Sequence, residues 1–228
     1  MSSHPVVYVT VDVVAFTIVD GALMVLVVER GVEPFRGEPA LPGGFVLPDE
    51  GLDAAARREL REETGVDEPV LEQLRTYGAP GRDPRARTVS VAYLAVLPEP
   101  VTPLAGSDAA AAAWRAVDDV RATGLAFDHD AIVDDAVERL AGKLEYTALA
   151  TAFLAEEFTL ADVRAVYETV WGRPLDPGNF QRKLRAGADW VVPTGELRAA
   201  GRGRPAALFR ARKSGTAPLD RPLVRSGL

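Results

Sequence analysis

The chain has 228 residues, of which 47% are hydrophobic and 26% are charged, a composition typical of a globular protein with one large domain or two small ones. It has no cysteine, which excludes a disulfide framework and thiol catalysis and fits the reducing cytoplasm in which we expect the protein. The formal net charge of −7 divides into −12 for residues 1–149 (13 Lys and Arg against 25 Asp and Glu) and +5 for residues 150–228 (13 against 8), so we expect two domains, the second with an anionic partner.

The N-terminal segment is apolar but does not have the pattern of a membrane anchor. Asp12, Asp20 and Gly21 interrupt the apolar run at 6–28, which argues against a membrane span. No Lys or Arg precedes Arg30, which argues against a signal peptide. We therefore expect no membrane partner.

The acidic part of the chain has the pattern of a mixed α/β fold. Residues 6–19 and 22–29 are rich in Val, Ile and Phe, and the Asp-Gly pair between them is typical of a two-residue hairpin turn. A Pro/Gly-rich loop at 34–44 follows. Further along, we expect strands at 70–77, 88–97 and 114–117 and a helix at 129–140.

The most specific pattern in the chain runs from Gly44 to Val66 and reads GFVLPDEGLDAAARRELREETGV. We expect a helix in it, with Asp53 as N-cap and Gly65 as the stop. With U for a bulky aliphatic residue, it fits G-x5-E-x7-R-E-U-x-E-E-x-G-U at every specified position, which are Gly44, Glu50, Arg58, Glu59, Leu60, Glu62, Glu63, Gly65 and Val66.

The three glutamates of this helix share one face, because they are related by three and four positions. Their carboxylates repel one another unless a cation lies among them, and oxygen ligands favour Mg²⁺ or Mn²⁺. We expect Glu59, Glu62 and Glu63 to bind this metal, with Gly44 allowing positive φ and a close approach of its carbonyl. Together with Arg58, which orients them, these glutamates form the expected catalytic group. The alternative is a solvated helix face with ion pairs such as Arg58 with Glu62.

This pattern is the Nudix box, and the chain resembles the Nudix family, which implies an α/β/α sandwich. In Nudix enzymes that act on ADP-ribose, a proline recurs near the distance at which Pro80 follows Gly65 here. The resemblance therefore implies ADP-ribose or a related nucleotide as the ligand, the alternative being an ordinary turn with solvated arginines. The expected effector-binding residues are Arg36, Gly43, Gly44, Arg82 and Arg87.

Beyond Lys143 the pattern changes. The segment 146–153 is apolar with helical propensity, and Thr159 can cap a helix at 160–171. A second helix is expected at 177–185 and short strands at 190–192 and 206–210, the order of a winged helix-turn-helix domain. From 214 to 228 no periodicity remains, so we expect a disordered tail.

The second of these helices surrounds Phe180 and Leu184 with side chains of the types that contact bases or phosphates in a major groove. The segment from Arg202 to Pro205 resembles the core of an AT-hook, whose arginines enter narrow minor grooves. The alternative is an ordinary solvated basic surface. The expected DNA-binding residues are Asn179, Gln181, Arg182, Lys183, Arg185, Arg198, Arg202 and Arg204.

Taken over residues 6–212, the chain resembles the Nudix-related transcriptional regulators of NAD metabolism. The resemblance implies a Nudix domain at 1–145, a winged helix-turn-helix DNA-binding domain at 146–213 and a flexible tail at 214–228. It rests on the motifs at 34–37, 82–85, 126–129, 156–159, 179–184, 193–195 and 201–205.

The family resemblance implies a repressor of NAD metabolism genes that senses ADP-ribose or a related nucleotide and binds palindromic double-stranded operator DNA as a homodimer. Many members of that family have an eroded Nudix box, whereas the box here is complete. The alternative function is therefore a Mg²⁺-dependent ADP-ribose pyrophosphatase. Pro39 stands where relatives commonly have tryptophan.

Overall fold

The computed structural model describes residues 5–65, 70–102, 109–186, 190–199, 205–212 and 215–225, without the side chains of 63, 64, 109, 110 and 186. The chain divides into two compact units. The first comprises Met1–Phe16, Met24–Val96 and Pro100–Ala136, and the second comprises Thr17–Leu23, Leu97–Glu99 and Val137–Leu228. The last division between the units falls between Ala136 and Val137, within helix α3 (His129–Tyr146). The predicted domain boundary at 145/146 lies further along, at the end of this helix.

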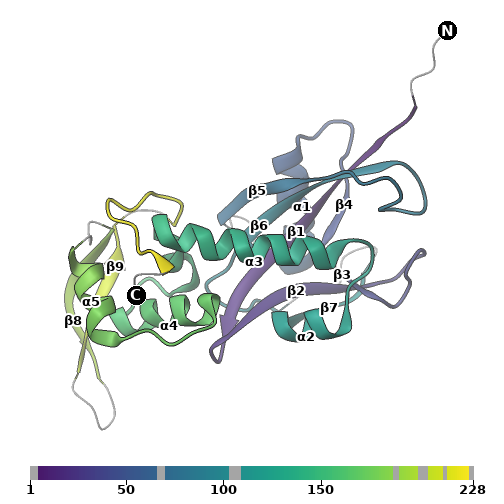
Figure 1. The fold of residues 1–228 in the computed structure, drawn as a ribbon. Coiled ribbons are helices and arrows are strands. Elements are labelled where there is room, and N and C mark those ends of the chain that lie inside the picture. Colours follow the sequence, from purple (N-terminus) through teal and green to yellow (C-terminus); the bar gives the residue numbers. More distant parts are fainter. Residues whose placement is uncertain are drawn as a thin grey trace. The chain divides into compact units, whose positions relative to one another are not determined.

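The first unit is built on a mixed sheet whose central strand is β1 (Figure 1). The order is β3-β2-β1-β6-β5, with β4 paired to β1 and β7 paired to β2. Strand β1 runs parallel to β6 and antiparallel to β4. The bounds are β1 Tyr8–Val19, β2 Ala22–Arg30, β3 Pro39–Ala40, β4 Gly43–Phe45, β5 Val70–Tyr77, β6 Thr88–Val96 and β7 Ala109–Ala116.

The predicted hairpin is confirmed, since β1 and β2 are neighbours joined by Asp20 and Gly21. Both turn residues have positive φ, 48° and 78°, as a two-residue turn that matches the twist of the strands requires. The strands at 70–77 and 88–97 also form where expected. Strand β7 is longer than the predicted strand at 114–117.

Helix α1 (Leu52–Thr64) packs against the sheet through small and aliphatic side chains. Ala55, Ala56 and Leu60 are fully buried against one face of β1. In Figure 1 α1 lies behind the strands and the first half of α3 lies in front, so the predicted α/β/α sandwich is confirmed. Helix α2 (Val117–Thr123) was not expected, because its buried face offers only Val117 and Val120 as an apolar signal.

The predicted end of α1 is confirmed, whereas its predicted N-cap is wrong. Gly65 ends the helix as predicted, with φ of 73° and its N–H bonded to the carbonyl of Arg61. The predicted cap Asp53 is wrong, because Gly51 is the N-cap and no side chain caps the helix. Asp53 instead lies in the first turn, where its Oδ1 accepts a 2.6 Å hydrogen bond from the hydroxyl of Tyr93. A carboxylate in this turn still favours the positive end of the helix dipole.

The second unit contains the predicted helix, turn, helix and hairpin. The capping box is present at the start of α4, where Thr159 Oγ1 accepts from the N–H of Asp162 and the Asp162 carboxylate accepts from the N–H of Thr159. The predicted helical segment at 146–153 is a 3₁₀ helix, η1, that starts after Thr147. The bounds are η1 Ala148–Phe153, α4 Leu160–Trp171, α5 Pro177–Ala186, β8 Val191–Arg198 and β9 Ala206–Ala211.

The C-terminal segment corrects the prediction of a disordered tail, for residues 215–225. The N–H of Leu219 bonds to the carbonyl of Tyr146 at 2.8 Å, and the N–H of Leu223 bonds to the carbonyl of Glu145 at 2.7 Å. Both leucine side chains are buried, and Arg225 forms ion pairs with Glu138 and Glu145. The sequence gives little sign of this packing, because only two apolar residues anchor an otherwise polar, proline-containing segment.

Within the described residues, none of the helices has the length and apolar character needed to cross a bilayer.

Replacing Leu223 with alanine tests whether the C-terminal segment belongs to the folded unit. The substitution removes a side chain that is 3% exposed, so we expect the free energy of unfolding to fall by about 2–4 kcal/mol. The neighbouring Val224, which is 46% exposed, is the control. Val224→Ala should change the free energy of unfolding by less than about 0.5 kcal/mol. Equal values for the two variants in urea titrations would show that the segment contributes nothing to stability.

Candidate functional site

The first unit contains a cleft of about 290 Å³ on the carboxylate face of α1. Side chains from six segments that are far apart in the sequence line it. They are Thr10 and Asp12 from β1, Val28, Arg30 and Val32 from β2 and the residues after it, Leu41, Gly43 to Phe45 and Leu47 from β4 and the residues beside it, Arg58, Glu59 and Glu62 from α1, Arg82, Asp83 and Arg85 from the loop before β6, and Phe127 and His129 near the start of α3.

Arg58 holds the acidic side of the cleft together. Its Nη2 lies 2.7 Å from Glu50 Oε1 and its Nη1 lies 2.7 Å from Glu59 Oε1. The same Nη1 is 3.6 Å from Glu62 Oε2. The hydrogen bond from Arg58 lowers the pKa of Glu50. Glu50 therefore acts from outside the helix, by fixing the guanidinium that lies between the two cleft-facing glutamates.

Gly44 and Glu59 approach each other closely. A Cβ atom at position 44 would lie 2.2 Å from Glu59 Oε1, and one at position 43 would lie 2.3 Å from the carbonyl oxygen of Val11. Neither glycine has positive φ, so the expectation of that conformation is wrong. A side chain does not fit at either position, because the backbone at Gly43 lies directly against β1 and the backbone at Gly44 lies directly against the Glu59 carboxylate.

The described part of the site has ligand chemistry that fits a divalent metal ion. Burial raises the pKa of Glu59, while the charge and hydrogen bond of Arg58 act against this shift. A buried carboxylate of this kind gains from a nearby cation, and carboxylate oxygens suit a hard ion. Among the described side chains no group of three or more acidic or histidine residues forms a metal cluster, and the side chain of Glu63, the third predicted ligand, lies outside them.

The floor of the cleft is a buried charge network rather than a free cationic surface. Arg82, whose side chain is 4% exposed, lies 2.6 Å from Asp128 Oδ1 and 3.2 Å from Asp12 Oδ2. Asp12 Oδ2 also accepts a 2.5 Å hydrogen bond from the hydroxyl of Ser90. The Arg82 guanidinium, which is predicted to contact the effector, is thus already shared by two carboxylates.

His129 completes this network in its neutral form. Its Nδ1 accepts a 2.9 Å hydrogen bond from the N–H of Leu41, and its Nε2 lies 3.5 Å from Asp12 Oδ1. Burial lowers the pKa of His129. Since Nδ1 is an acceptor, the single proton of the neutral ring is on Nε2, toward Asp12.

The other predicted effector residues are placed differently. Gly43 and Gly44 line the cleft, whereas Arg36 and Arg87 are not among the residues that line it. The Arg36 side chain is 63% exposed and lies 4.0 Å from Glu33, and Arg87 bonds to the carbonyl of Thr88.

The sequence does not mark the aromatic and arginine wall of the cleft, which is formed by Arg30, Phe45, Arg85 and Phe127. The rings of Phe35 and Phe127 pack edge to face at 4.8 Å, and both residues have positive φ, a strained conformation for a bulky side chain. The guanidinium of Arg30 lies 4.7 Å from the centre of the Phe127 ring, and that of Arg85 lies 5.8 Å from it and 5.6 Å from the Phe45 ring. No periodicity marks these residues. By contrast, the polar Thr10 and Asp12 at alternate positions of an apolar strand would have been a usable signal.

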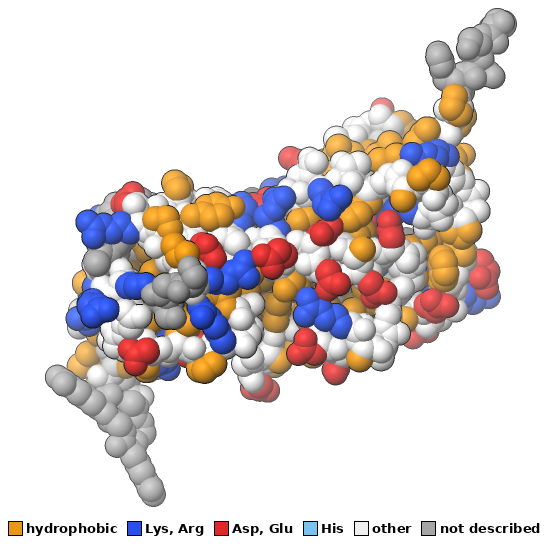
Figure 2. Space-filling model, viewed as in Figure 1, with side chains coloured by type: hydrophobic (Ala, Val, Ile, Leu, Met, Phe, Trp, Pro, Cys, Tyr) orange, Lys and Arg blue, Asp and Glu red, His pale blue; other side chains and the backbone are white. Residues whose placement is uncertain are grey.

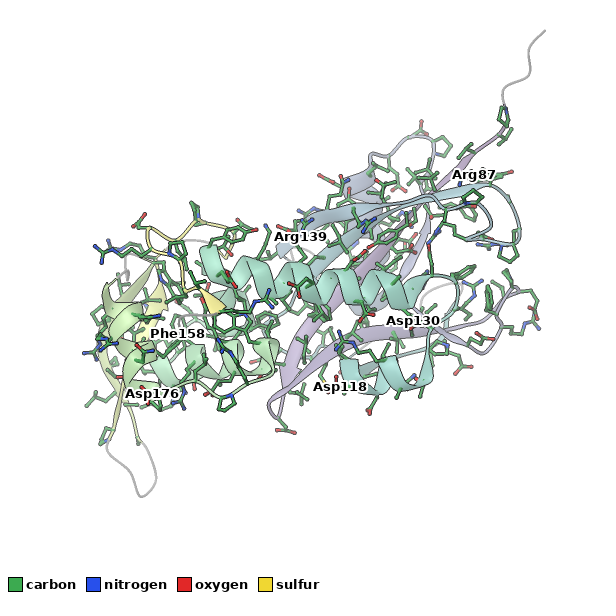
Figure 3. The ribbon with its side chains drawn as sticks, in the orientation of Figure 1. Arg87, Asp118, Asp130, Arg139, Phe158 and Asp176 are labelled. Carbon is green, nitrogen blue, oxygen red and sulfur yellow. The ribbon has the colours of Figure 1, made fainter. Side chains whose placement is uncertain are left out.

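The second unit presents polar side chains on one face of α5. Phe180 and Leu184 are buried as predicted. Asp176, labelled in Figure 3, accepts a 2.7 Å hydrogen bond from the N–H of Asn179 at the helix start. Of the five predicted DNA-binding residues of α5, Gln181, Arg182 and Arg185 are exposed, and Asn179 and Lys183 are partly buried. Figure 2 shows Lys and Arg side chains over this unit.

Arg198 lies on β8 and is held by the start of α4. Its Nη1 is 2.7 Å from Asp162 Oδ2, and its Nη2 donates to the carbonyl of Glu157 at 3.2 Å. On β9, Arg210 pairs with Glu157 at 2.7 Å. The predicted contacts Arg202 and Arg204 lie outside the described residues.

The neutral His129 makes stability depend on pH. Because its pKa is lowered in the folded state, the folded chain binds fewer protons than the unfolded chain once the pH falls below about 6.5. We expect the free energy of unfolding to be highest above that pH and to fall, between pH 6.5 and 5.5, by up to about 1.4 kcal/mol per unit. The slope should shrink in His129→Gln, and a wild-type slope that persists unchanged in this variant would contradict the assignment. Urea titrations at several pH values provide the measurement.

Two family models match the chain, the NUDIX domain over residues 9–136 and the NrtR DNA-binding winged helix domain over residues 150–211. The ADPR responsive transcriptional repressor NtrR of Acinetobacter baylyi is 35% identical over 212 residues, which are 92% of this chain and 84% of that protein.

Solved structures match both the whole chain and its first part. Shewanella oneidensis NrtR complexed with a 27mer DNA is 37% identical with a TM-score of 0.83, over 95% of this chain and 99% of that one. The NUDIX domain of the same protein complexed with ADP ribose is 38% identical with a TM-score of 0.57, over 60% of this chain and 90% of that one. Nudix hydrolases generally use a divalent metal ion. The chain belongs to the Nudix family, in the group whose NUDIX domain is followed by the NrtR DNA-binding winged helix domain.

Proposed function

We propose that this chain is an ADP-ribose-responsive transcriptional repressor, which binds operator DNA through the winged helix and ADP-ribose through the Nudix cleft. The observation that carries the proposal is the extent of the likeness to the repressor of Acinetobacter baylyi, which covers both units rather than the Nudix domain alone. The Shewanella oneidensis proteins complexed with DNA and with ADP ribose support the two binding partners. Genes of NAD metabolism are the proposed targets.

The DNA contact is made by α5. Its buried Phe180 and Leu184 fix the helix on the domain core, so that Gln181, Arg182 and Arg185 are available to bases and phosphates. Asn179 and Lys183 belong to the same set, and Arg202 and Arg204 are the proposed minor-groove contacts of the wing.

Arg198 has a different part in the proposed complex. Its guanidinium spans Asp162 and the carbonyl of Glu157, so it positions the wing against α4 and is not counted among the DNA contacts. A homodimer places two recognition helices on a pseudo-palindromic operator, with half-sites about one helical turn apart.

The effector occupies the cleft between the acidic face of α1 and the aromatic wall. Mg²⁺ or Mn²⁺ is held by Glu59, Glu62 and Glu63 with the backbone at Gly44. When bound, such an ion neutralises diphosphate charge and polarises phosphorus. Arg58 orients the glutamates, and the aromatic wall offers the flat apolar surface on which a nucleobase stacks.

Hydrolysis of ADP-ribose is the second candidate function, and the complete Nudix box favours it. A repressor with this activity would destroy its own effector, so the two functions are compatible. The two functions can be told apart experimentally, because sensing requires only that ADP-ribose binds, whereas the enzyme must also hydrolyse it in a metal-dependent reaction.

The first test is DNA binding by the α5 double variant Arg182→Ala with Lys183→Ala. We expect affinity for the chain's own upstream promoter to fall at least about tenfold, since base and phosphate contacts are both lost. Arg121→Ala in α2 is the control for loss of positive charge and should bind as wild type does. The measurement is fluorescence anisotropy at two salt concentrations, with and without ADP-ribose. Undiminished binding by the double variant, or a DNA affinity that ADP-ribose leaves unchanged, contradicts the repressor proposal.

The second test concerns the metal. We expect Glu62→Gln and Glu63→Gln each to weaken Mg²⁺ binding and to abolish any hydrolysis of ADP-ribose, because a charged ligand is lost. Gly44→Ala should have the same effect, since the added Cβ meets the Glu59 carboxylate. Asp118→Asn, at a side chain 95% exposed on α2, is the matched control. Calorimetry gives the Mg²⁺ affinity and product chromatography the turnover. A wild type without metal-dependent turnover eliminates the enzyme, and variants that keep wild-type Mg²⁺ affinity contradict the ligand assignment.

A further inference from the structure

Thr10 is a buried polar residue on the central strand of the sheet. It is 8% exposed, and its hydroxyl has no hydrogen-bond partner among the described residues. The residue lines the cleft, and it pairs in register with Phe45, next to the pair formed by Val11 and Gly44. The residue thus borders the cleft beside the strand that carries Gly44, and its hydroxyl oxygen is buried.

Burying the Thr10 hydroxyl without a hydrogen-bond partner is unfavourable in free energy, and no contact among the described residues offsets it. A buried hydroxyl without a partner loses its hydrogen bonds to water and gains none in return. Valine has nearly the same shape, favours strands equally well and surrounds this position in the sequence. Buried polar groups without partners are rare in folded proteins, and at a cleft the missing partner is supplied by what binds there.

We propose that Thr10 Oγ1 forms a direct hydrogen bond with the bound effector and contributes to its selection. The inference rests on the proposed function, because it takes the ligand to be a ribosylated diphosphate. Asp12, two residues along the strand, also lines the cleft, but its carboxylate is already shared by Ser90, Arg82 and His129. The Thr10 hydroxyl can both donate and accept, which suits a ligand group that does the same, as a ribose hydroxyl does.

The experiment compares Thr10→Val with Thr10→Ser in titration calorimetry of the full chain. The probes are ADP-ribose and ADP, which share the adenosine diphosphate and differ in the terminal ribose. We expect Thr10→Val to weaken ADP-ribose binding about 3- to 10-fold and Thr10→Ser to restore it to within about 2-fold of wild type. A loss confined to ADP-ribose assigns the bond to the terminal ribose, and a loss for both probes assigns it to the shared part.

Thr17 provides a matched control on the same strand. Its hydroxyl is also buried without a partner among the described residues, but it does not line the cleft. Thr17→Val should therefore leave ADP-ribose affinity unchanged, while both valine variants should unfold at or above the wild-type temperature. Wild-type affinity in Thr10→Val, or an equal loss in Thr17→Val, overturns the inference. A wild type that binds no ADP-ribose instead defeats the proposed function, so the two failures are distinct.

Discussion

The close contact between Gly44 and the Glu59 carboxylate is the constraint on which the cleft depends. It brings β4 against α1 with no side chain between them, and β4 in turn is paired to β1. Arg58 reaches Glu59 and Glu62 within its own helix, and it reaches Glu50 because the helix lies close to the loop that carries Glu50. The absence of a side chain at position 44 thus allows β4 to lie directly against the Glu59 carboxylate.

Features governed by local chemistry could be predicted from the sequence. The Asp-Gly hairpin turn, the Gly65 stop of α1 and the Thr159 capping box each follow from the backbone preferences of a few adjacent residues. Arg82 lines the cleft, and its role in effector binding stays a prediction. Its pairing with Asp12 and Asp128 could not be predicted, because these carboxylates reach it only through the fold. The wall formed by Phe127, Arg30 and Arg85 is likewise assembled from distant segments.

The arginines of the winged helix unit show the same distinction. Basic composition predicts an anionic partner, and on α5 the exposed side chains remain consistent with that expectation. Composition cannot separate these arginines from Arg198 and Arg210, whose charges are matched by acidic groups of the same unit. Each of these two pairs contributes zero to the net charge of +5, so that excess is carried by the other basic residues of 150–228.

The parallel pairing of β1 with β6 has a consequence for the nascent chain. Tyr8 pairs with Thr88 and Phe16 pairs with Val96, so the central strand leaves the ribosome long before its parallel partner does. The β1–β2 hairpin can form early, but the other edge of β1, rich in valine, stays open to wrong strand partners until β6 is synthesised. Synthesis of residues 88–96 thus supplies the strand that covers this edge, and a pause before it would prolong the interval in which the edge is open.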